Sequence, residues 1–333
     1  MKYGSRFRPS PRGRLAGAIG LLILAGLIGA LVFVGRIEPE RETPVDRLAS
    51  RAVPSAAGLL EIAPTHRLIA LGLPSSGRAG TRVAVDALDS LAFGPGLDAV
   101  GVLASADEQA ALDRYLASFP EDPTLLPRES PSTAALEGVY RAVWRINDAL
   151  GDDRALRVIA LEPPGWPPGA AESPASAVNR WEARARHAAA ALEEGLLGRE
   201  PNARVLLLVD GLDALRAVRV RAVGGGSGTH APTSLASLLR ARYGRQLFTV
   251  LVDGPPPGGG ASGRVVGYGG TSLFDDARRR WSGESRFAPL KGLPDPGRVE
   301  VVVVTRPGIS TEFQPRDAPL TEMVDAYLYP GVG

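Results

Sequence analysis

Six continuous apolar runs alternate with helical segments, and this alternation constrains the fold more than any other feature of the chain. The runs are Arg67–Gly72, Asp98–Leu103, Leu156–Glu162, Arg204–Asp210, Leu247–Asp253 and Val299–Thr305. They are apolar at successive positions, which is typical of parallel strands covered on both faces. Helices are expected near Thr81–Ala92, Ala106–Ser118, Thr133–Leu150, Ala177–Leu197 and Ser234–Arg242, with a last one around Leu320–Tyr329. We therefore predict an α/β domain with a mainly parallel sheet flanked by helices.

A run of 21 residues without a charge, Leu15–Gly35, precedes this domain. As a helix it would be about 31 Å long, enough to cross a hydrocarbon core of roughly 30 Å. Arg12 and Arg14 come just before the run, so we expect the N-terminus in the cytoplasm and the C-terminal domain outside it. A cleaved signal peptide is the alternative, but its apolar region is usually about 7–15 residues long.

The expected organisation is therefore a cytoplasmic basic tail (1–14), a transmembrane helix (15–35), a Pro-rich tether (36–63) and an extracytoplasmic α/β domain (64–333). This describes a single-pass protein of the plasma (inner) membrane with an uncleaved signal anchor. Small residues four positions apart, Ala25 with Gly29 and Gly26 with Ala30, have the spacing at which two membrane helices pack closely. A homodimer through this helix is a further expectation.

Charge and composition exclude some classes of partner. Five of the 38 basic residues lie in the tail, which leaves 33 basic against 36 acidic residues in the rest of the chain. No stripe of Lys and Arg with interleaved aromatic residues is present, so nucleic acid is not an expected partner. The chain has no cysteine, which excludes disulfides and thiolate metal sites.

Polar residues end several of the predicted strands, and parallel strands bring these ends to one edge of a sheet. The six ends are Gly72, Leu103, Glu162, Asp210, Asp253 and Thr305. Carboxylates there can bind a metal or act as acid and base, although Asp and Gly also end strands for conformational reasons. Ser75 and Ser76 are the hydroxyls of the loop after the first strand, where a role in capping the next helix is favoured over nucleophilic catalysis.

A phosphate-binding loop is an alternative for the same stretch. Gly72 and Gly77 have the required spacing, and Arg204–Leu215 resembles the strand and Asp that hold magnesium. However, Arg78 and Ala79 stand where such a loop needs a lysine and a hydroxyl. The three histidines, at positions 66, 187 and 230, have no metal-binding spacing in the sequence, and no metal site is predicted.

Three local frames carry a resemblance to a known family: Leu71-Gly72-Leu73-Pro74-Ser75-Ser76-Gly77, Val102-Leu103-Ala104, and Val209-Asp210-Gly211-Leu212-Asp213. In order and spacing they resemble erythromycin-esterase-like proteins, which belong with the ChaN/Tiki superfamily of haem-binding uptake proteins and proteases. The resemblance implies glutamates at the positions of Leu73 and Leu103, and histidines at those of Ser76, Asp210 and Asp213. Of the family's polar residues, only Glu162 and Arg186 look retained.

The resemblance therefore implies a degenerate member, because neither Leu nor Ser offers an imidazole lone pair near neutral pH. We predict a pseudoenzyme that binds or scaffolds an extracytoplasmic ligand or protein partner and that needs no cofactor. No residue is predicted to be catalytic. The candidate cleft comprises Gly72, Leu73, Ser75, Ser76, Leu103, Glu162, Arg186, Asp210, Asp213 and Asp253. Two alternatives stay open: a hydrolase that uses Glu162, Asp210 and Asp213 with a divalent metal, and a degenerate nucleotide-binding module.

Overall fold

The computed structural model describes residues 43–74, 78–127, 131–151, 154–166, 174–217, 219–222, 229–230, 233–253, 266–269, 272–293, 300–306, 309–314 and 320–331. Predictions for the tail, the transmembrane helix, Ser75 and Ser76 lie outside these residues. Within them, none of the helices has both the length and the apolar character needed to cross a membrane.

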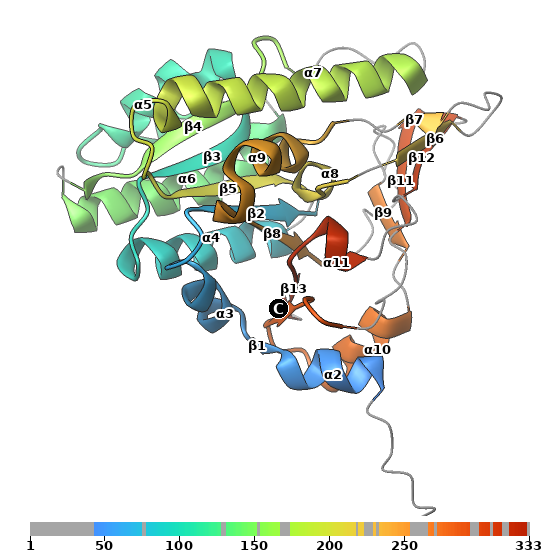
Figure 1. Cartoon of the computed structure of the whole chain (residues 1–333). Coiled ribbons are helices and arrows are strands. Elements are labelled where there is room, and N and C mark those ends of the chain that lie inside the picture. The colour runs from blue at the N-terminus through green and yellow to red at the C-terminus, as the bar shows by residue number, and fades with distance from the viewer. Residues whose placement is uncertain are drawn as a thin grey trace, which may run out of the picture. The chain divides into compact units, whose positions relative to one another are not determined.

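A mixed sheet forms the centre of the described domain (Figure 1). Its eight strands follow the order β1-β10-β13-β8-β2-β5-β3-β4. Their bounds, in that order, are Val53–Pro54, Arg286–Pro289, Ala326–Tyr329, Leu247–Val252, Leu68–Leu73, Val205–Asp210, Ala99–Ser105 and Arg157–Glu162. The strands from β13 to β4 pair in parallel, whereas β10 and β1 are antiparallel to their neighbours. The prediction of an α/β domain is confirmed.

Helices cover both faces of this sheet (Figure 1). One face carries α3 (Ser55–Ile62), α4 (Arg78–Phe93), α5 (Gln109–Leu116) and α6 (Pro131–Leu150); the other carries α7 (Pro174–Leu192) and α9 (Leu235–Tyr243). Within β2, Ile69 and Leu71 face the first group, and Leu68 and Ala70 face the second. Both faces of each central strand are therefore buried, which explains why the runs are apolar at successive positions.

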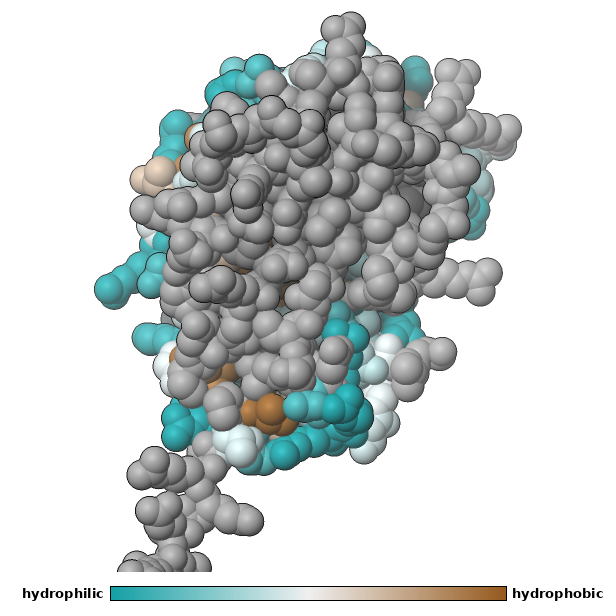
Figure 2. Space-filling model, turned by 90° about the vertical axis from the view of Figure 1, so that its right-hand side faces the viewer, coloured by the Kyte–Doolittle hydropathy of each residue, from teal (hydrophilic) through white to brown (hydrophobic). Residues whose placement is uncertain are grey.

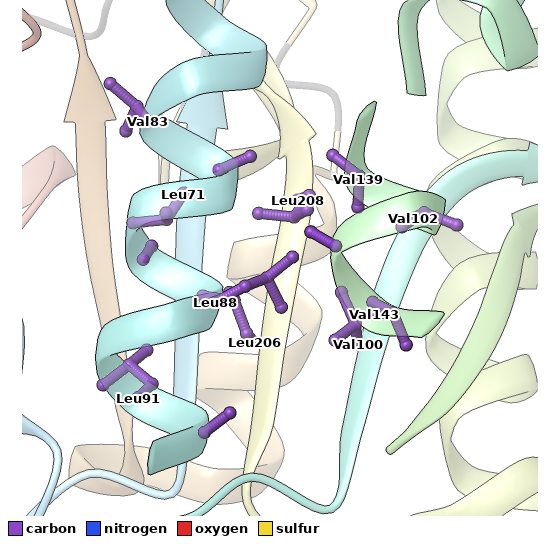
Figure 3. Close-up of a cluster of buried hydrophobic side chains, with 14 of the residues drawn as sticks. Leu71, Val83, Leu88, Leu91, Val100, Val102, Val139, Val143, Leu206 and Leu208 are labelled. Atoms are coloured by element: carbon purple, nitrogen blue, oxygen red, sulfur yellow. The ribbon is translucent and has the colours of Figure 1, made fainter. Parts of the chain in front are cut away.

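Figure 3 shows the core between the sheet and the first group of helices. Leu88 and Leu91 of α4 and Val143 of α6 pack on side chains of β2, β5 and β3, among them Leu71 and Val100. All these side chains are buried. The helices form here because their apolar residues recur every three or four positions and so lie along one face.

Residues 44–62, which the sequence analysis placed in the tether, form α2 (Pro44–Arg51), β1 and α3. Leu48 of α2 is fully buried in a third apolar cluster with Trp281, which follows α10 (Ser272–Arg280), and with Tyr327 of β13. The apolar positions of this segment therefore contribute to the core. On the one face shown in Figure 2, the coloured atoms of the described residues are mainly hydrophilic, with a small hydrophobic patch near the lower edge.

Two sequence predictions near the C-terminus are wrong. Residues 326–329 form β13 instead of the end of a helix; α11 (Leu320–Met323) is a single turn. All four residues of β13 are buried between β10 and β8, so sheet pairing outweighs the local helical pattern. The run Val299–Thr305 forms β11 (Glu300–Arg306) of a second sheet, so Thr305 does not join the edge of the main sheet.

That second sheet is antiparallel, and its five strands follow the order β7-β6-β12-β11-β9. Their bounds are Thr229–His230, Arg219–Ala222, Ile309–Gln314, Glu300–Arg306 and Val266–Gly269. Short helical turns complete the described elements: η1 (Ala106–Glu108), η2 (Pro123–Leu125), the π-helical η4 (Glu193–Leu197), α8 (Gly211–Ala214) and η5 (Gly244–Gln246).

Candidate functional site

Three of the predicted carboxylates meet one arginine at the carboxyl edge of the main sheet. Glu162 ends β4, Asp210 ends β5, and Asp213 follows in α8. The guanidinium of Arg184, from α7, pairs with all three: its Nη1 lies 3.4 Å from Glu162 Oε1, and its Nη2 donates to Asp210 Oδ2 and Asp213 Oδ2. We call these four residues the Arg184 cluster.

The cluster is buried except at one point. The exposed fraction of the side chain is 4% for Arg184, 5% for Glu162 and 2% for Asp213, but 22% for Asp210. Asp210 is therefore the group through which solvent or a ligand can reach the cluster. Its other oxygen, Oδ1, accepts a hydrogen bond of 2.9 Å from the backbone N–H of Asp213 and so caps α8.

Aromatic side chains and a helix end complete the surroundings of the cluster. Trp181 Nε1 donates to Asp213 Oδ1 at 2.9 Å, and the backbone N–H of Leu235, at the start of α9, donates to the same carboxylate. The half-buried Trp166 lies with its ring centroid 5.6 Å from Arg184 Cζ, within the range of a cation–π contact. The loop that carries Trp166 is fixed by Asp107, whose Oδ2 accepts from the Gly165 N–H at 2.6 Å.

Burial and charge act in opposite directions within the cluster. Burial by itself lowers the pKa of Arg184, but the carboxylates of Asp210, Asp213 and Glu162 outweigh it, and the net pKa is raised. For Asp213, burial raises the pKa to about 7 against the opposing effect of Arg184. The arginine therefore stays charged, while Asp213 changes protonation near neutral pH.

This arrangement differs from a metal centre, because a cation of the protein itself already lies among the carboxylates. The described residues contain no group of three or more His, Cys, Asp and Glu side chains arranged to hold a metal ion. With all groups ionised, the three carboxylates exceed the single guanidinium by two negative charges. The cluster thus suits the binding of a polar or cationic group at Asp210.

Other predicted cleft residues have structural roles beside the cluster. Leu73 pairs in register with Asp210 and packs against the core. A Cβ on Gly72 would lie 2.6 Å from the Cβ of Ala214 and 3.0 Å from the Cα of Gly211, so this glycine allows α8 to approach β2. Leu103 lies at an irregularity of the β3–β4 ladder and packs against the core on the α7 face.

Asp253 belongs to a different group of side chains. It follows β8 and is buried, and its Oδ2 lies 3.1 Å from Arg278 Nε of α10. The hydroxyl of Tyr327 also interacts with this carboxylate, and burial followed by Asp253 raises the pKa of Tyr327. Asp253 therefore does not belong to the Arg184 cluster. Its partners are Arg278 and Tyr327, and Tyr327 is part of the third apolar cluster.

The arginine of the cluster is Arg184, and the predicted Arg186 lies elsewhere. Arg186 is exposed and pairs with Glu182, one turn earlier on α7. Sequence reasoning missed Arg184, Trp181 and Trp166. A signal for Arg184 was present, because it shares helical spacing with the apolar residues Trp181, Ala188 and Leu192. A charge on the apolar face of a predicted helix indicates a buried partner of opposite charge.

A fourth residue missed from the sequence is Tyr140 of α6. It is fully buried, and its hydroxyl has no hydrogen-bond partner among the described residues. Burial raises its pKa, and the charges of Glu108 and Glu162 raise it further. The hydroxyl therefore stays protonated and lies within the field of the carboxylate at Glu162.

No protein-family model matches the chain, and no curated protein matches it at a significant level. Solved structures are similar in fold. An erythromycin esterase mutant, EreC in its open conformation, has a TM-score of 0.52 at 12% identity, over 83% of this chain and 93% of that one. A protein of Bacillus cereus has a TM-score of 0.51 at 10% identity, over 86% and 96%. A succinoglycan biosynthesis protein has a TM-score of 0.55 at 8% identity, over 88% and 97%. The described domain therefore has the fold of an erythromycin esterase.

Proposed function

We propose that the chain is a single-pass membrane protein whose extracytoplasmic domain binds a ligand or partner at the Arg184 cluster, without the hydrolytic chemistry of erythromycin-esterase-like proteins. The fold similarity supports the domain, and the uncharged run Leu15–Gly35 supports the anchor. The choice between binding and hydrolysis depends on the residues at the carboxyl edge of the main sheet.

One observation carries the proposal: the buried carboxylates are already paired with Arg184. Asp210 accepts from a permanently charged guanidinium, which makes it a weak general base because its negative charge is engaged. Asp213 has a pKa near 7, but both of its oxygens accept hydrogen bonds and its side chain is only 2% exposed, so a substrate cannot reach it. Where the resemblance to erythromycin-esterase-like proteins implies glutamate, this chain has Leu73 and Leu103. Where it implies histidine, the chain has Ser76, Asp210 and Asp213. The cluster itself contains no histidine. Binding is therefore favoured over bond cleavage.

The test measures turnover by the full chain in detergent. Erythromycin is a suitable probe because EreC is an esterase for it. We expect no hydrolysis of the lactone between pH 5 and pH 9, measured by mass spectrometry of the product. Turnover that disappears in an Asp210→Asn variant, but not in the exposed control Asp148→Asn, would show that the site is catalytic and overturn the proposal.

A metal-dependent hydrolase remains a second candidate, since three carboxylates do converge in one place. It predicts that manganese, calcium or zinc raises the melting temperature of the full chain and that Asp210→Ala removes the effect. We expect no such shift while Arg184 is present, because the guanidinium and a divalent ion would compete for the same oxygens. The nucleotide-binding alternative is less favoured, because close packing on α8 accounts for Gly72 and the pairing with Arg184 accounts for Asp210.

A further inference from the structure

A basic surface lies where the described domain begins. It is formed by residues of α2 and α10 and by the turn after β10: Arg47, Arg51, Arg279, Arg280 and Lys291. Four of these five residues are exposed, and Arg47 is half-buried. We call this surface the α2–α10 face.

Contacts within the domain hold these residues together. Arg51 Nη1 donates to the backbone oxygen of Lys291 at 2.9 Å, which joins the end of α2 to the turn after β10. Arg280 pairs with Asp46, which joins the end of α10 to the start of α2. The buried Leu48 fixes α2 in the third apolar cluster. The basic side chains therefore belong to one fixed surface.

The charge of this face is opposite to that of the remaining domain. Residues 44–51 contain two basic residues and one acidic residue, residues 272–280 contain three basic and two acidic, and Lys291 adds one basic residue. Arg278 is not part of the face, because it pairs with the buried Asp253. Without Arg278, the five basic residues of the face and the three aspartates of α2 and α10 give a formal charge of +2, although the chain after residue 14 has a net charge of −3. A positive surface on an otherwise negative domain is suited to an anionic partner.

The position of this face in the chain indicates which anionic partner it meets. Only eight residues, 36–43, separate Gly35 from Pro44, at the start of α2. Fully extended, they span at most about 28 Å. If Leu15–Gly35 crosses the membrane, α2 is therefore confined to the neighbourhood of the lipid headgroups, where lysine and arginine side chains near an anionic surface are attracted to it.

We propose that the α2–α10 face docks on anionic phospholipid headgroups of the membrane that anchors the chain. This proposal rests on the anchor in the proposed function. Docking orients the domain with α2 and α10 toward the bilayer.

The test uses the full chain, which has no cysteine, in lipid nanodiscs with a nitroxide on the headgroup of a fraction of the lipids. A fluorescent dye is placed at Ser50→Cys on α2 or at the exposed control position Ala190→Cys on α7. The nitroxide quenches the dye only near contact. In discs containing phosphatidylglycerol we expect quenching at position 50 to be at least two-fold stronger than at position 190 and to fall at high salt. In discs of phosphatidylcholine alone, that difference should disappear.

Charge reversal provides the matched control. Arg47→Glu with Arg51→Glu should reduce quenching at position 50 to the phosphatidylcholine level. Arg114→Glu with Arg245→Glu, two exposed arginines on other elements, should leave it unchanged. Equal quenching in both lipids, or an equal effect of the two double variants, overturns docking. A chain that fails to enter the discs at all overturns the anchor of the proposed function instead, so the two failures are distinguishable.

Discussion

Arg184 is the residue on which the candidate site depends. It is buried and holds three carboxylates that would otherwise repel one another. Removing one partner of a buried ion pair is costly, because the charges left behind are neither hydrated nor compensated.

We predict that Arg184→Met lowers the free energy of unfolding by about 3–5 kcal/mol. Arg186→Met is the matched control on the same helix; its exposed pair with Glu182 should contribute less than about 1 kcal/mol. Denaturant unfolding of the two variants measures the difference. Similar losses in both would contradict the structural role assigned to Arg184.

The pKa of Asp213 leads to a prediction about pH. Because burial raises it from 3.8 in the unfolded chain to about 7 in the fold, the folded state binds the proton more tightly. The stability from this group is complete below about pH 4 and is lost as the pH rises through 7. Between pH 5 and pH 8 we expect the unfolding free energy to fall by on the order of 2 kcal/mol more than in Asp213→Asn. Parallel pH profiles of the two proteins would argue against this titration.

Gly72 is predicted to tolerate no side chain. In Gly72→Ala the new Cβ would lie 2.6 Å from the Cβ of Ala214, and overpacking of this kind costs about 1–3 kcal/mol. Gly195→Ala is the control, since its Cβ would meet only Ile159 at 3.9 Å or more. Melting temperatures should fall in the first variant and stay or rise in the second. A fall in the control alone would contradict this account of Gly72.

At the scale of elements, the local sequence pattern predicted the long helices, whereas tertiary contacts decided the conformation of a short segment. The helices α4, α6, α7 and α9 were predicted to within a few residues, because a long amphipathic segment has one way to bury its apolar face. The short C-terminal segment was not: Ala326–Tyr329 is a strand because β10 and β8 pair with it on both sides. Four residues carry too little periodicity to distinguish a helix from a strand.

The place of β13 inside the sheet leads to a prediction. Leu328 is fully buried between neighbouring strands, so Leu328→Lys would bury an unpaired charge and should abolish cooperative unfolding. Glu322→Lys is the control: it also introduces a lysine close in sequence, but on the exposed turn α11, and should be tolerated. Circular dichroism melting curves distinguish the two. A cooperative transition in Leu328→Lys would show that β13 is dispensable.

At the scale of the whole molecule, the proposed membrane anchor predicts on which side of the bilayer each part of the chain lies. Because Arg12 and Arg14 precede the uncharged run, the C-terminal domain is predicted to lie outside the cytoplasm. A reporter enzyme that folds only outside the cytoplasm, fused after Gly333, should be active. A reporter that works only in the cytoplasm should be inactive at the same position, and the reverse pattern would invert the topology.

The sequence by itself determined the α/β class, the main helices, the strand-end carboxylates Glu162 and Asp210, and Asp213 three residues further on. It could do so because strands that are buried on both faces are apolar at successive positions, a pattern that is local in the chain. Tertiary structure alone decided their partner. Arg184 and the predicted Arg186 are two residues apart on α7, so the helical rotation of about 200° between them sends one into the core and the other to solvent. It also decided that the run at 299–305 belongs to a second sheet, since strand pairing depends on contacts distant in sequence.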